Sequence, residues 1–527
     1  MTLRIEAPHA GSRAQVSVAS RWLPWVAAVF ASGLRLATGS FPVDDAYITF
    51  RYARNLVTGF GLVYNQGETV LGTSSPMFTL LLAAPAAVFG VEHIPLYAFL
   101  MSAAADGVAV WLMSCLALML GIPSLWAGLA VFLQALAPLS VRYAGSGLEA
   151  SLVTALLLGA VYAHVERRDG VAAHLAGASA LLRPDGLAVG AVIVASLALE
   201  KRRVPWRTVA ILAAWIAPVA LVISAIYGSP VPHTVAAKSS PIYQVGPLTN
   251  GLQFLYHFGG LFIGAAQGLA ARGLVIRPEA GLTLVYGLFA ALQFPLWVKG
   301  AGHAWRTDGR WFAAIAYPVL FASVYTAVGL RGSLMAEWYL VPLLPLWILF
   351  FTDGLRQALA SLRPRLRRFA SLTLGCAMLA CMVGGLNLGR DASRPFLTPA
   401  AVWDEREKLY AQVAAFLVPR VGTGDVVAAS EIGALGFGCN CRILDTVGLA
   451  SPDSLNYYPI SADLPGFNAV PPGLIHDQRP EYLVSLEIFV RPTLSLDGWF
   501  RENYRPILRL ETQAFGSDGL FVYQRLP

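Results

Sequence analysis

Long apolar stretches separated by short polar segments fill the chain as far as about residue 389. A helix needs about 20 apolar residues to cross a bilayer alone, and shorter runs can cross inside a bundle. The pattern therefore predicts an all-α polytopic membrane bundle of about eleven transmembrane helices. The predicted spans begin at Trp22 and continue over 95–119, 125–139, 148–164, 171–182, 187–199, 207–226, 280–298, 311–330, 335–352 and 369–388.

Short basic clusters between these runs indicate the orientation, because Lys and Arg gather in cytoplasmic loops. If the tail over 1–21 is cytoplasmic, the eleven spans leave every basic cluster on the cytoplasmic side. This requires that two other apolar stretches, Pro76–Gly90 and Gly251–Ala270, do not cross the membrane. Both are then expected as outer-face or re-entrant helices. The clusters are 167–168, 201–203, 299–310 and 363–368, and the segments left on the outer face are 38–94, 140–147, 183–186, 227–279, 331–334 and everything after 389.

Composition narrows the class of protein. Hydrophobic residues make up 56% of the 527 residues, charged residues only 13%, and the mean hydropathy is +0.59. A soluble or disordered chain carries more charge than this. The net charge of +7 comes from short clusters between spans, and not from a continuous basic surface, so we expect no nucleic-acid partner.

The last part of the chain has a different pattern. A helical stretch to about Leu417 precedes short β-like runs, which Pro and Gly separate. The sequence thus predicts three parts: a cytoplasmic tail (1–21), a transmembrane domain (22–389, first outer loop 38–94) and an extracytoplasmic α/β domain (390–527). Cys439 and Cys441 are too close for an ordinary zinc site and would form a strained bridge, so we expect an unlinked pair. The β-like runs are Asp425–Ala429, Arg442–Val447, Tyr482–Leu486 and Gly519–Tyr523.

Two adjacent carboxylates, Asp44 and Asp45, follow the first span. After Pro42 they could cap a helix or belong to a charged helix on the membrane surface. At helical spacing Asp44 shares a face with Tyr47 and Arg51. We favour a catalytic role, because many ionisable residues are predicted on the same side and such groups at membrane level usually mark a site. They are Glu68, Arg142, Glu149, Arg183, Asp185, His233 and Lys238.

This combination of residue types suits one kind of chemistry. A carboxylate can take a proton from a sugar hydroxyl, while Lys and Arg can hold a phosphate and stabilise its charge as it leaves. The substrate that fits both is a sugar carried on a lipid phosphate. The sequence has no glycine-rich phosphate loop that would indicate a nucleotide.

Several motifs resemble the GT-C superfamily of polyprenyl-phosphate-sugar-dependent membrane glycosyltransferases, and within it the terminal arabinofuranosyltransferases. The first-loop motif is the most specific, and the others follow in the same order along nearly the whole chain. The matching segments are Asp44–Leu56, Gly59–Glu68, Gly72–Met77, Gly147–Glu149, Leu182–Gly186, Pro232–Lys238, Tyr339–Pro345, Glu431–Gly436 and Leu444–Pro452.

The resemblance implies a polyprenyl-phosphate donor and residue roles. The family's first-loop acidic residue falls on Asp44, with Asp45 beside it, Glu149 is the second acidic residue, and Arg183 lies near a basic residue that meets the lipid phosphate. The same three acids are candidate ligands for a divalent cation, whose involvement stays open. The other candidates for binding donor or substrate are Arg51, Tyr52, Arg142, Asp185, His233 and Lys238.

We therefore expect a hexosyl- or pentosyltransferase of the bacterial cytoplasmic membrane with its active site facing the periplasm. It would move a sugar, arabinofuranose being one candidate, to a cell-envelope glycan, a glycolipid or a secreted protein. A transporter or lipid-glycan flippase is the alternative, although the chain lacks the repeat symmetry typical of transporters. A sensor with an outer binding domain is a third class. The oligomeric state is left open.

Overall fold

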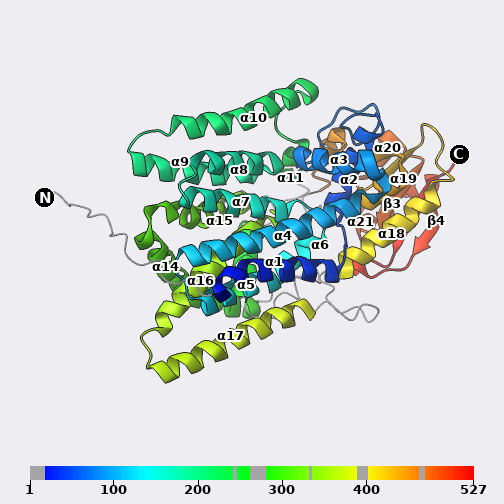
Figure 1. The fold of residues 1–527 in the computed structure, drawn as a ribbon. Coiled ribbons are helices and arrows are strands. Elements are labelled where there is room, and N and C mark those ends of the chain that lie inside the picture. Colours follow the sequence, from blue (N-terminus) through cyan, green and yellow to red (C-terminus); the bar gives the residue numbers. More distant parts are fainter. Residues whose placement is uncertain (1–17, 241–245, 262–279, 332–334, 388–400, 462–468) are drawn as a thin grey trace.

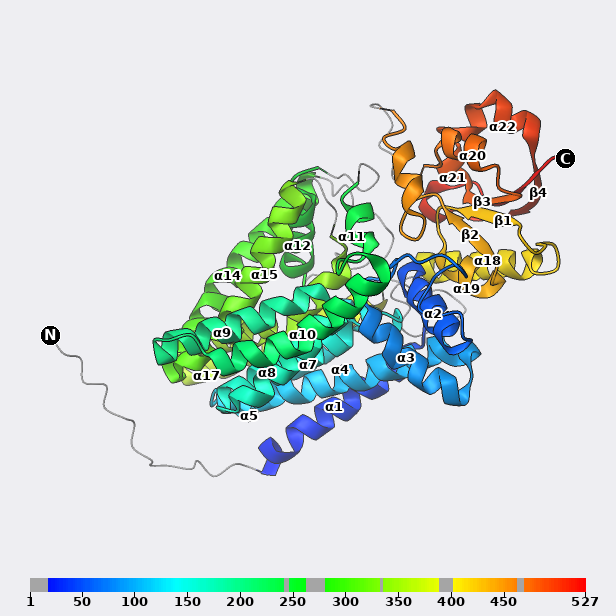
Figure 2. The ribbon, with the colours of Figure 1, turned by 90° about the horizontal axis from the view of Figure 1, so that it is seen from above.

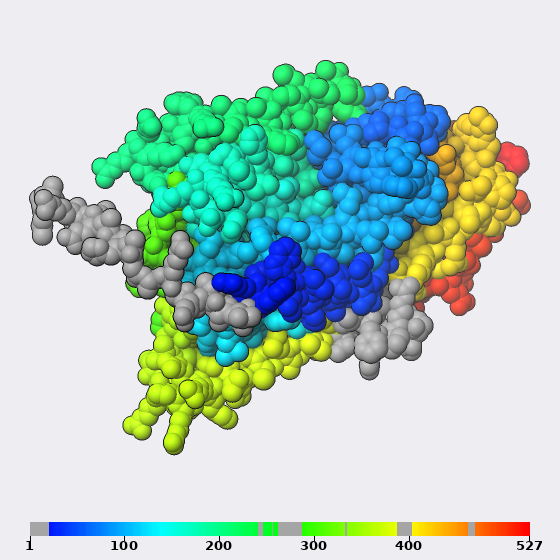
Figure 3. All heavy atoms as spheres, in the orientation of Figure 1, coloured from blue at the N-terminus to red at the C-terminus, as the bar shows by residue number. Residues whose placement is uncertain are grey.

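A computed structural model describes residues 18–240, 246–261, 280–331, 335–387, 401–461 and 469–527. The chain forms a helical bundle with a small α/β domain against one end of it (Figures 1 and 2). In the space-filling view, the first loop after α1, in blue, abuts this C-terminal domain, in yellow to red (Figure 3). The two parts therefore meet where the sequence places its candidate site.

Each predicted span overlaps at least one helix, so the prediction of a mostly helical bundle is confirmed. Five described stretches are long and apolar enough to cross a bilayer, and the pair α5 (Ser124–Leu136) and α6 (Pro138–Gly145), bent by 45°, makes a sixth if it counts as one span. The protein is thus a multi-pass membrane protein. The bundle helices are α1 (Val18–Thr38), α4 (Ile94–Met119), α5 (Ser124–Leu136), α7 (Ala150–Val165), α8 (Asp169–Leu182), α9 (Leu187–Lys201), α10 (Trp206–Tyr227), α14 (Ala280–Thr307), α15 (Phe312–Leu330), α16 (Leu344–Leu359) and α17 (Pro364–Asn387).

The bundle helices differ in how far they are buried. The apolar window that contains α16 is 89% buried, whereas that of α10 is 6% buried, although α10 is the more apolar of the two. A helix that is apolar all round needs protein or lipid on every side. The helix α16 therefore lies in the protein core, and α10 at the rim presents its surface to lipid (Figure 1).

The predicted outer segments form short helices at the domain-facing end of the bundle. Pro76–Gly90 corresponds to α3 (Pro76–Phe89), and Gly251–Ala270 contains most of α12 (Thr249–Gly259), while its part beyond residue 261 lies outside the described residues. The α3 helix has 14 residues, too few to cross a bilayer alone. The other short elements at this end are α2 (Asp44–Val57), α6 (Pro138–Gly145), α11 (His233–Lys238), η1 (Val91–His93), η2 (Pro184–Gly186) and η6 (Glu337–Leu343).

Basic clusters from different loops meet at the other end of the bundle. Arg310, in η5 (Gly309–Trp311), forms ion pairs with Asp169 (2.6 Å) and Glu200 (2.9 Å), and Lys201 pairs with Asp169 (3.1 Å). The helix α9 runs from η2 at one end to Lys201 at the other, about 20 Å at 1.5 Å per residue. The loops assigned to the two sides of the membrane therefore do separate in space.

The C-terminal domain contains a five-stranded sheet in the order β2-β1-β3-β5-β4. Strands β2, β1 and β3 are parallel, and β5 is antiparallel to β3 and β4. The sequence predicted every strand except β4, an edge strand with Pro506 at an irregularity in its pairing, because proline weakens a strand pattern and is tolerated at edges. The elements are α18 (Ala401–Leu417), β1 (Val426–Ala429), α19 (Gly433–Cys439), β2 (Arg442–Asp445), η7 (Pro452–Tyr457), α20 (Pro472–Gln478), β3 (Tyr482–Leu486), α21 (Glu487–Val490), η8 (Leu494–Leu496), α22 (Gly498–Asn503), β4 (Tyr504–Leu510), η9 (Ala514–Gly516) and β5 (Leu520–Arg525).

Candidate active site

The helix α2 holds the two adjacent acids of the first loop. Asp44 and Asp45 are its first residues, while the N-cap is Val43, which makes no side-chain capping bond. The capping explanation of the acidic pair is therefore wrong. Acids in a first turn still interact favourably with the helix dipole. Because consecutive side chains differ by about 100° around a helix, the two carboxylates point to different partners.

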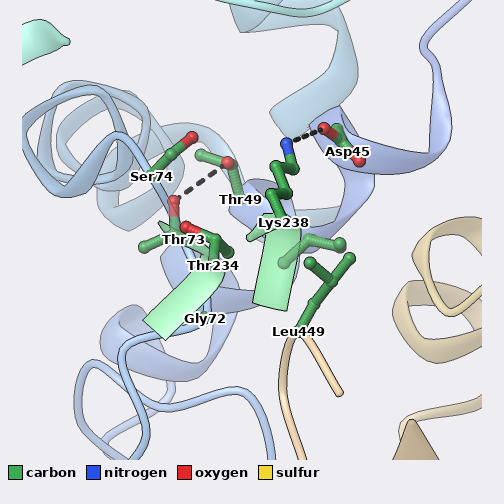
Figure 4. Close-up of a pocket in the computed structure, with 9 residues that line it drawn as sticks. Asp45, Thr49, Gly72, Thr73, Ser74, Thr234, Lys238 and Leu449 are labelled. Carbon is green, nitrogen blue, oxygen red and sulfur yellow. Dashed lines mark hydrogen bonds and ion pairs between the residues drawn. The ribbon is translucent and has the colours of Figure 1, made fainter. Parts of the chain in front are cut away.

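Asp45 faces a small pocket at the end of the bundle. Its carboxylate accepts a hydrogen bond from Lys238 of α11 at 3.2 Å, and Thr49 and Thr73 lie 3.2 Å apart beside it (Figure 4). The pocket is small and partly open to solvent. Its lining is rich in hydroxyl groups and consists of Asp45, Ile48, Thr49, Gly72, Thr73, Ser74, Thr234, Lys238 and Leu449.

Two aromatic residues of η6 connect this pocket to a second cation. The ammonium of Lys238 lies 5.7 Å from the ring centre of Trp338, and the guanidinium of Arg183 lies 4.3 Å from that of Tyr339. The two rings stack at 6.2 Å. Burial alone would lower the pKa of Lys238, but the charge of Asp45 raises it above its usual value, so the ammonium stays protonated. Both cations thus stay charged beside an aromatic wall.

Arg183 is almost completely buried between two acids. It donates two hydrogen bonds to Asp185 (2.9 and 2.6 Å), and Glu149 lies 3.7 Å from it. The Nη1 atom of Arg183 is buried and makes no hydrogen bond to any residue that the structure describes. A buried donor without a partner costs free energy, so this atom is suited to a ligand oxygen.

Arg142 is held by a neighbouring acid of η6. Glu337 accepts a hydrogen bond from Arg142 (2.8 Å) and another from Tyr143, and His257 of α12 lies 2.9 Å from it. The cation therefore supports the segment that carries the two aromatic residues. His233 begins α11, and its backbone N–H donates to Leu71 (2.9 Å), while burial lowers the pKa of its ring.

Arg51 and Tyr52, predicted to bind the donor, have structural partners instead. All three guanidinium nitrogens of Arg51 donate hydrogen bonds within the protein, two of them to the C-terminal domain, at Gly436 and Cys441. The hydroxyl of Tyr52 donates to Val70 (2.6 Å) and accepts from Gly72 (2.7 Å). With these polar atoms already bonded, both side chains hold the first loop in place.

Asp44, predicted as the main catalytic acid beside the cations, points from α2 in a different direction, towards the C-terminal domain. Its carboxylate accepts the N–H of Gly433 at 2.7 Å, where α19 begins. Burial, together with the nearby charge of Glu407, raises the pKa of Asp44 to about 8. Burial likewise raises the pKa values of Glu407 and Glu431 to about 7, although Arg406 pairs with both at 2.5 Å. These four ionisable groups form a closed acidic cluster between α2 and the C-terminal domain.

The candidate metal ligands Asp44, Asp45 and Glu149 are not brought together. Among the described residues, no group of three or more acidic, histidine or cysteine side chains is placed to hold a metal ion. The expectation of an unlinked cysteine pair is wrong, since Cys439 and Cys441 form a disulfide at the end of α19. No site role was predicted for Trp338, Tyr339 or Leu449, although Tyr339 and Leu449 lie in two of the matching motif segments, because their contacts join distant parts of the chain.

Comparisons with known proteins agree with this architecture. The C-terminal domain matches a family model described as a domain of unknown function, DUF8728, over residues 400–523. A terminal beta-(1->2)-arabinofuranosyltransferase of Mycobacterium tuberculosis (strain ATCC 25618 / H37Rv) is 31% identical over 246 residues. This match covers 42% of the chain and 38% of the relative, so the chain spans well under two thirds of that protein.

The solved structures extend the likeness to nearly the whole fold. ArnT from Cupriavidus metallidurans bound to undecaprenyl phosphate superposes with a TM-score of 0.54 at 12% identity, covering 96% of this chain and 98% of ArnT. Its apo form gives 0.51 at 13% identity, with coverages of 97% and 99%. The chain therefore has a fold like that of ArnT and, over part of its length, is similar in sequence to a terminal arabinofuranosyltransferase.

Proposed function

We propose that this protein is a glycosyltransferase that takes a sugar from a polyprenyl-phosphate donor at the outer face of the cytoplasmic membrane. The observation that carries the proposal is the arrangement around η6. One carboxylate and two cations, Asp45, Lys238 and Arg183, lie at the same end of an apolar bundle, beside a hydroxyl-lined pocket. The likeness to ArnT, whose crystal structure contains undecaprenyl phosphate, supports a lipid-linked donor.

The geometry supports Asp45 as the general base, in place of Asp44. In the proposed step an acceptor hydroxyl attacks the anomeric carbon of the donor, and the bond from that carbon to the phosphate oxygen breaks. The hydroxyl proton passes to the Asp45 carboxylate, and polyprenyl phosphate leaves with the bonding electron pair. Lys238 and the free Nη1 of Arg183 stabilise the charge on the departing phosphate.

Positive charge from these two side chains can do the work that a divalent cation does in other phosphate sites. We therefore expect transfer to survive a stringent chelator. Loss of activity on chelation, with recovery on adding back one metal, would show that a cation is needed as well.

The membrane arrangement belongs to the same proposal. Eleven spans with a cytoplasmic N-terminus put residues 38–94 and the domain over 390–527 outside, with the transmembrane domain between 22 and 389. Fusion reporters after Ser240 and after residue 395 should both read extracytoplasmic. A cytoplasmic reading at either position would reverse the sidedness of the pocket.

Transfer itself is tested with membranes that contain the protein and a panel of radiolabelled polyprenyl-phosphate sugars, polyprenyl-phosphate arabinofuranose among them. One donor should be consumed, with the label appearing in a glycan, glycolipid or protein acceptor. The matched Asp45→Asn membranes should not consume it. The proposal fails if the folded wild-type protein consumes none of the donors, and a flippase predicts movement of intact donor across the bilayer instead.

A further inference from the structure

The parallel part of the C-terminal sheet directs its carboxyl edge at the membrane domain. Strands β1 and β2 run in parallel and end at Ala429 and Asp445. The segment after β1 reaches Gly433, which donates its N–H to Asp44, and the segment after β2 reaches Leu449 in the pocket wall. Open sheets of parallel strands bind ligands beyond the carboxyl ends of their strands. The edge that binds ligands in such sheets therefore faces the bundle end.

Asp445 gives the segment after β2 a fixed shape. This aspartate is completely buried, and its two carboxylate oxygens accept the N–H groups of Val447 (2.9 Å) and Ala450 (2.7 Å). In the other direction, its own N–H donates to the hydroxyl of Ser451 (3.0 Å). One side chain thus closes the loop over residues 446–451 on itself, and this loop holds Leu449 in one position.

Leu449 forms one side of the pocket that contains Asp45. Its backbone oxygen lies 3.0 Å from where a Cβ on Gly72 would stand, so the loop packs directly on the first loop of the membrane domain. The residue is only 6% exposed. Of the side chains that line the pocket, Leu449 is the one supplied by the C-terminal domain, and Ile48 is the other large apolar one. A sugar has polar edges and an apolar C–H face, which suits such a mixed wall.

We propose that Leu449 determines which sugar the protein accepts, and that the C-terminal domain thereby acts as the selectivity wall of the pocket. This inference rests on the proposed glycosyltransferase function. The pocket is small, so a branched Leu side chain sets the room for groups carried by the sugar ring. Shape discrimination in an apolar contact is worth about 10- to 200-fold per methylene-sized group. Leu449 should therefore separate donors that differ by one exocyclic carbon.

The experiment compares two donors on the full-length protein in membranes: a polyprenyl-phosphate pentofuranose and a polyprenyl-phosphate hexose. Both kcat/KM for transfer and the Kd for donor without acceptor are measured for wild type, Leu449→Ala and Leu449→Phe. Leu449→Ala should shift the hexose-to-pentose ratio towards the hexose by about tenfold or more. Leu449→Phe should reduce binding of both sugars, while binding of unsubstituted polyprenyl phosphate stays unchanged.

Leu496→Ala is the matched control, since Leu496 is 75% exposed on the same domain. Its hexose-to-pentose ratio of kcat/KM should equal that of the wild-type protein. An unchanged ratio in a Leu449→Ala protein that transfers and melts normally overturns the selectivity role and leaves the function intact. A wild-type protein that binds neither donor overturns the proposed function and this inference with it. Loss of polyprenyl phosphate binding in Leu449→Phe would also overturn the role, because it would place the residue at the phosphate.

Discussion

Asp44 and Asp45 are neighbours in the chain, yet they lie in contrasting surroundings. Asp45 meets a lysine across a pocket lined with hydroxyl groups. Asp44 is covered by the C-terminal domain, where burial first and then the charge of Glu407 raise its pKa. The side of α2 that bears Asp45 has space for a substrate, whereas the side that bears Asp44 is filled by protein.

The contrast shows that the chemistry of a carboxylate is set by what packs against it. An acid that borders a pocket and is paired with a lysine is placed to accept a proton from a substrate hydroxyl. An acid buried among other acids carries a proton at neutral pH and so acts as a hydrogen-bonding group at an interface. We therefore propose that Asp45 is the catalytic group and that Asp44 helps to hold the C-terminal domain against α2.

The largest effect is expected from exchanging the two acids for amides. Asp45→Asn should reduce transfer by roughly a hundredfold or more, the scale for losing a general base. Asp44→Asn should keep near-normal transfer at neutral pH, because an amide has the shape of the protonated acid that a pKa of about 8 produces. Initial rates in membranes, with thermal melts to verify folding, measure both. The opposite ranking would return catalysis to Asp44.

A somewhat smaller loss is expected from Arg183→Ala. One charge-assisted contact to phosphate is worth about 1.5–3 kcal/mol, so donor binding should weaken by about 10- to 150-fold. Arg167→Ala at the other end of the bundle, where the side chain is 59% exposed, is the control and should leave the donor Kd unchanged. Titration with polyprenyl phosphate measures the effect. Equal affinity in both variants would remove Arg183 from the donor site.

The contact between α2 and the C-terminal domain can be disturbed without substituting Asp44 or Asp45. A Cβ on Gly433 would stand 2.3 Å from the backbone oxygen of Asp44, so Gly433→Ala must push α19 away from α2. Such overpacking costs about 1–3 kcal/mol. Hydrogen exchange across α2 and α19 should rise in this variant. Gly498→Ala has nothing within 4 Å of the added Cβ and should exchange as wild type. Unchanged protection in Gly433→Ala would show that the interface is not tightly packed.

A further effect is a pH dependence of the docked state. The pKa of Asp44 is raised from 3.8 to about 8, so the folded state binds more protons than the unfolded state between these values. Stability must then fall as pH rises from about 4 to about 8, by at most about 1.4 kcal/mol per pH unit for one group. Protease sensitivity of the C-terminal domain should increase over the neutral range, and Asp44→Asn should flatten the trend. A steeper trend in Asp44→Asn would contradict this origin.

The apolar pattern was sufficient to predict the helices, because each membrane segment must satisfy its own backbone hydrogen bonds. This requirement acts on one segment at a time. A stretch such as 207–226 must form a helix in lipid wherever its neighbours lie. The same local logic found Asp425–Ala429 and Tyr482–Leu486 as strands. It missed β4, whose Pro506 conceals an edge strand, and it placed no bond between Cys439 and Cys441.

Site residues were recognised by type better than by role. Lys238, Arg183 and Glu149, which the sequence analysis assigned to one side of the bundle, lie together at its domain-facing end. Arg51 was expected to bind the donor. Each of its guanidinium nitrogens instead donates a hydrogen bond within the protein, to Tyr64, Gly436 and other acceptors. Sequence shows that a charge exists, while its free bonding capacity depends on neighbours that can be hundreds of positions away.

The sequence by itself determined a multi-pass helical bundle, an appended α/β domain and a collection of ionisable groups that belong at one end. These follow from hydropathy and local spacing, which act within single segments. Only the tertiary structure decided that Lys238 pairs with Asp45, that the C-terminal domain covers Asp44, and that Leu449 closes the pocket. The physical reason is that two side chains about 100° apart on one helix look equivalent in sequence until packing gives each a different partner.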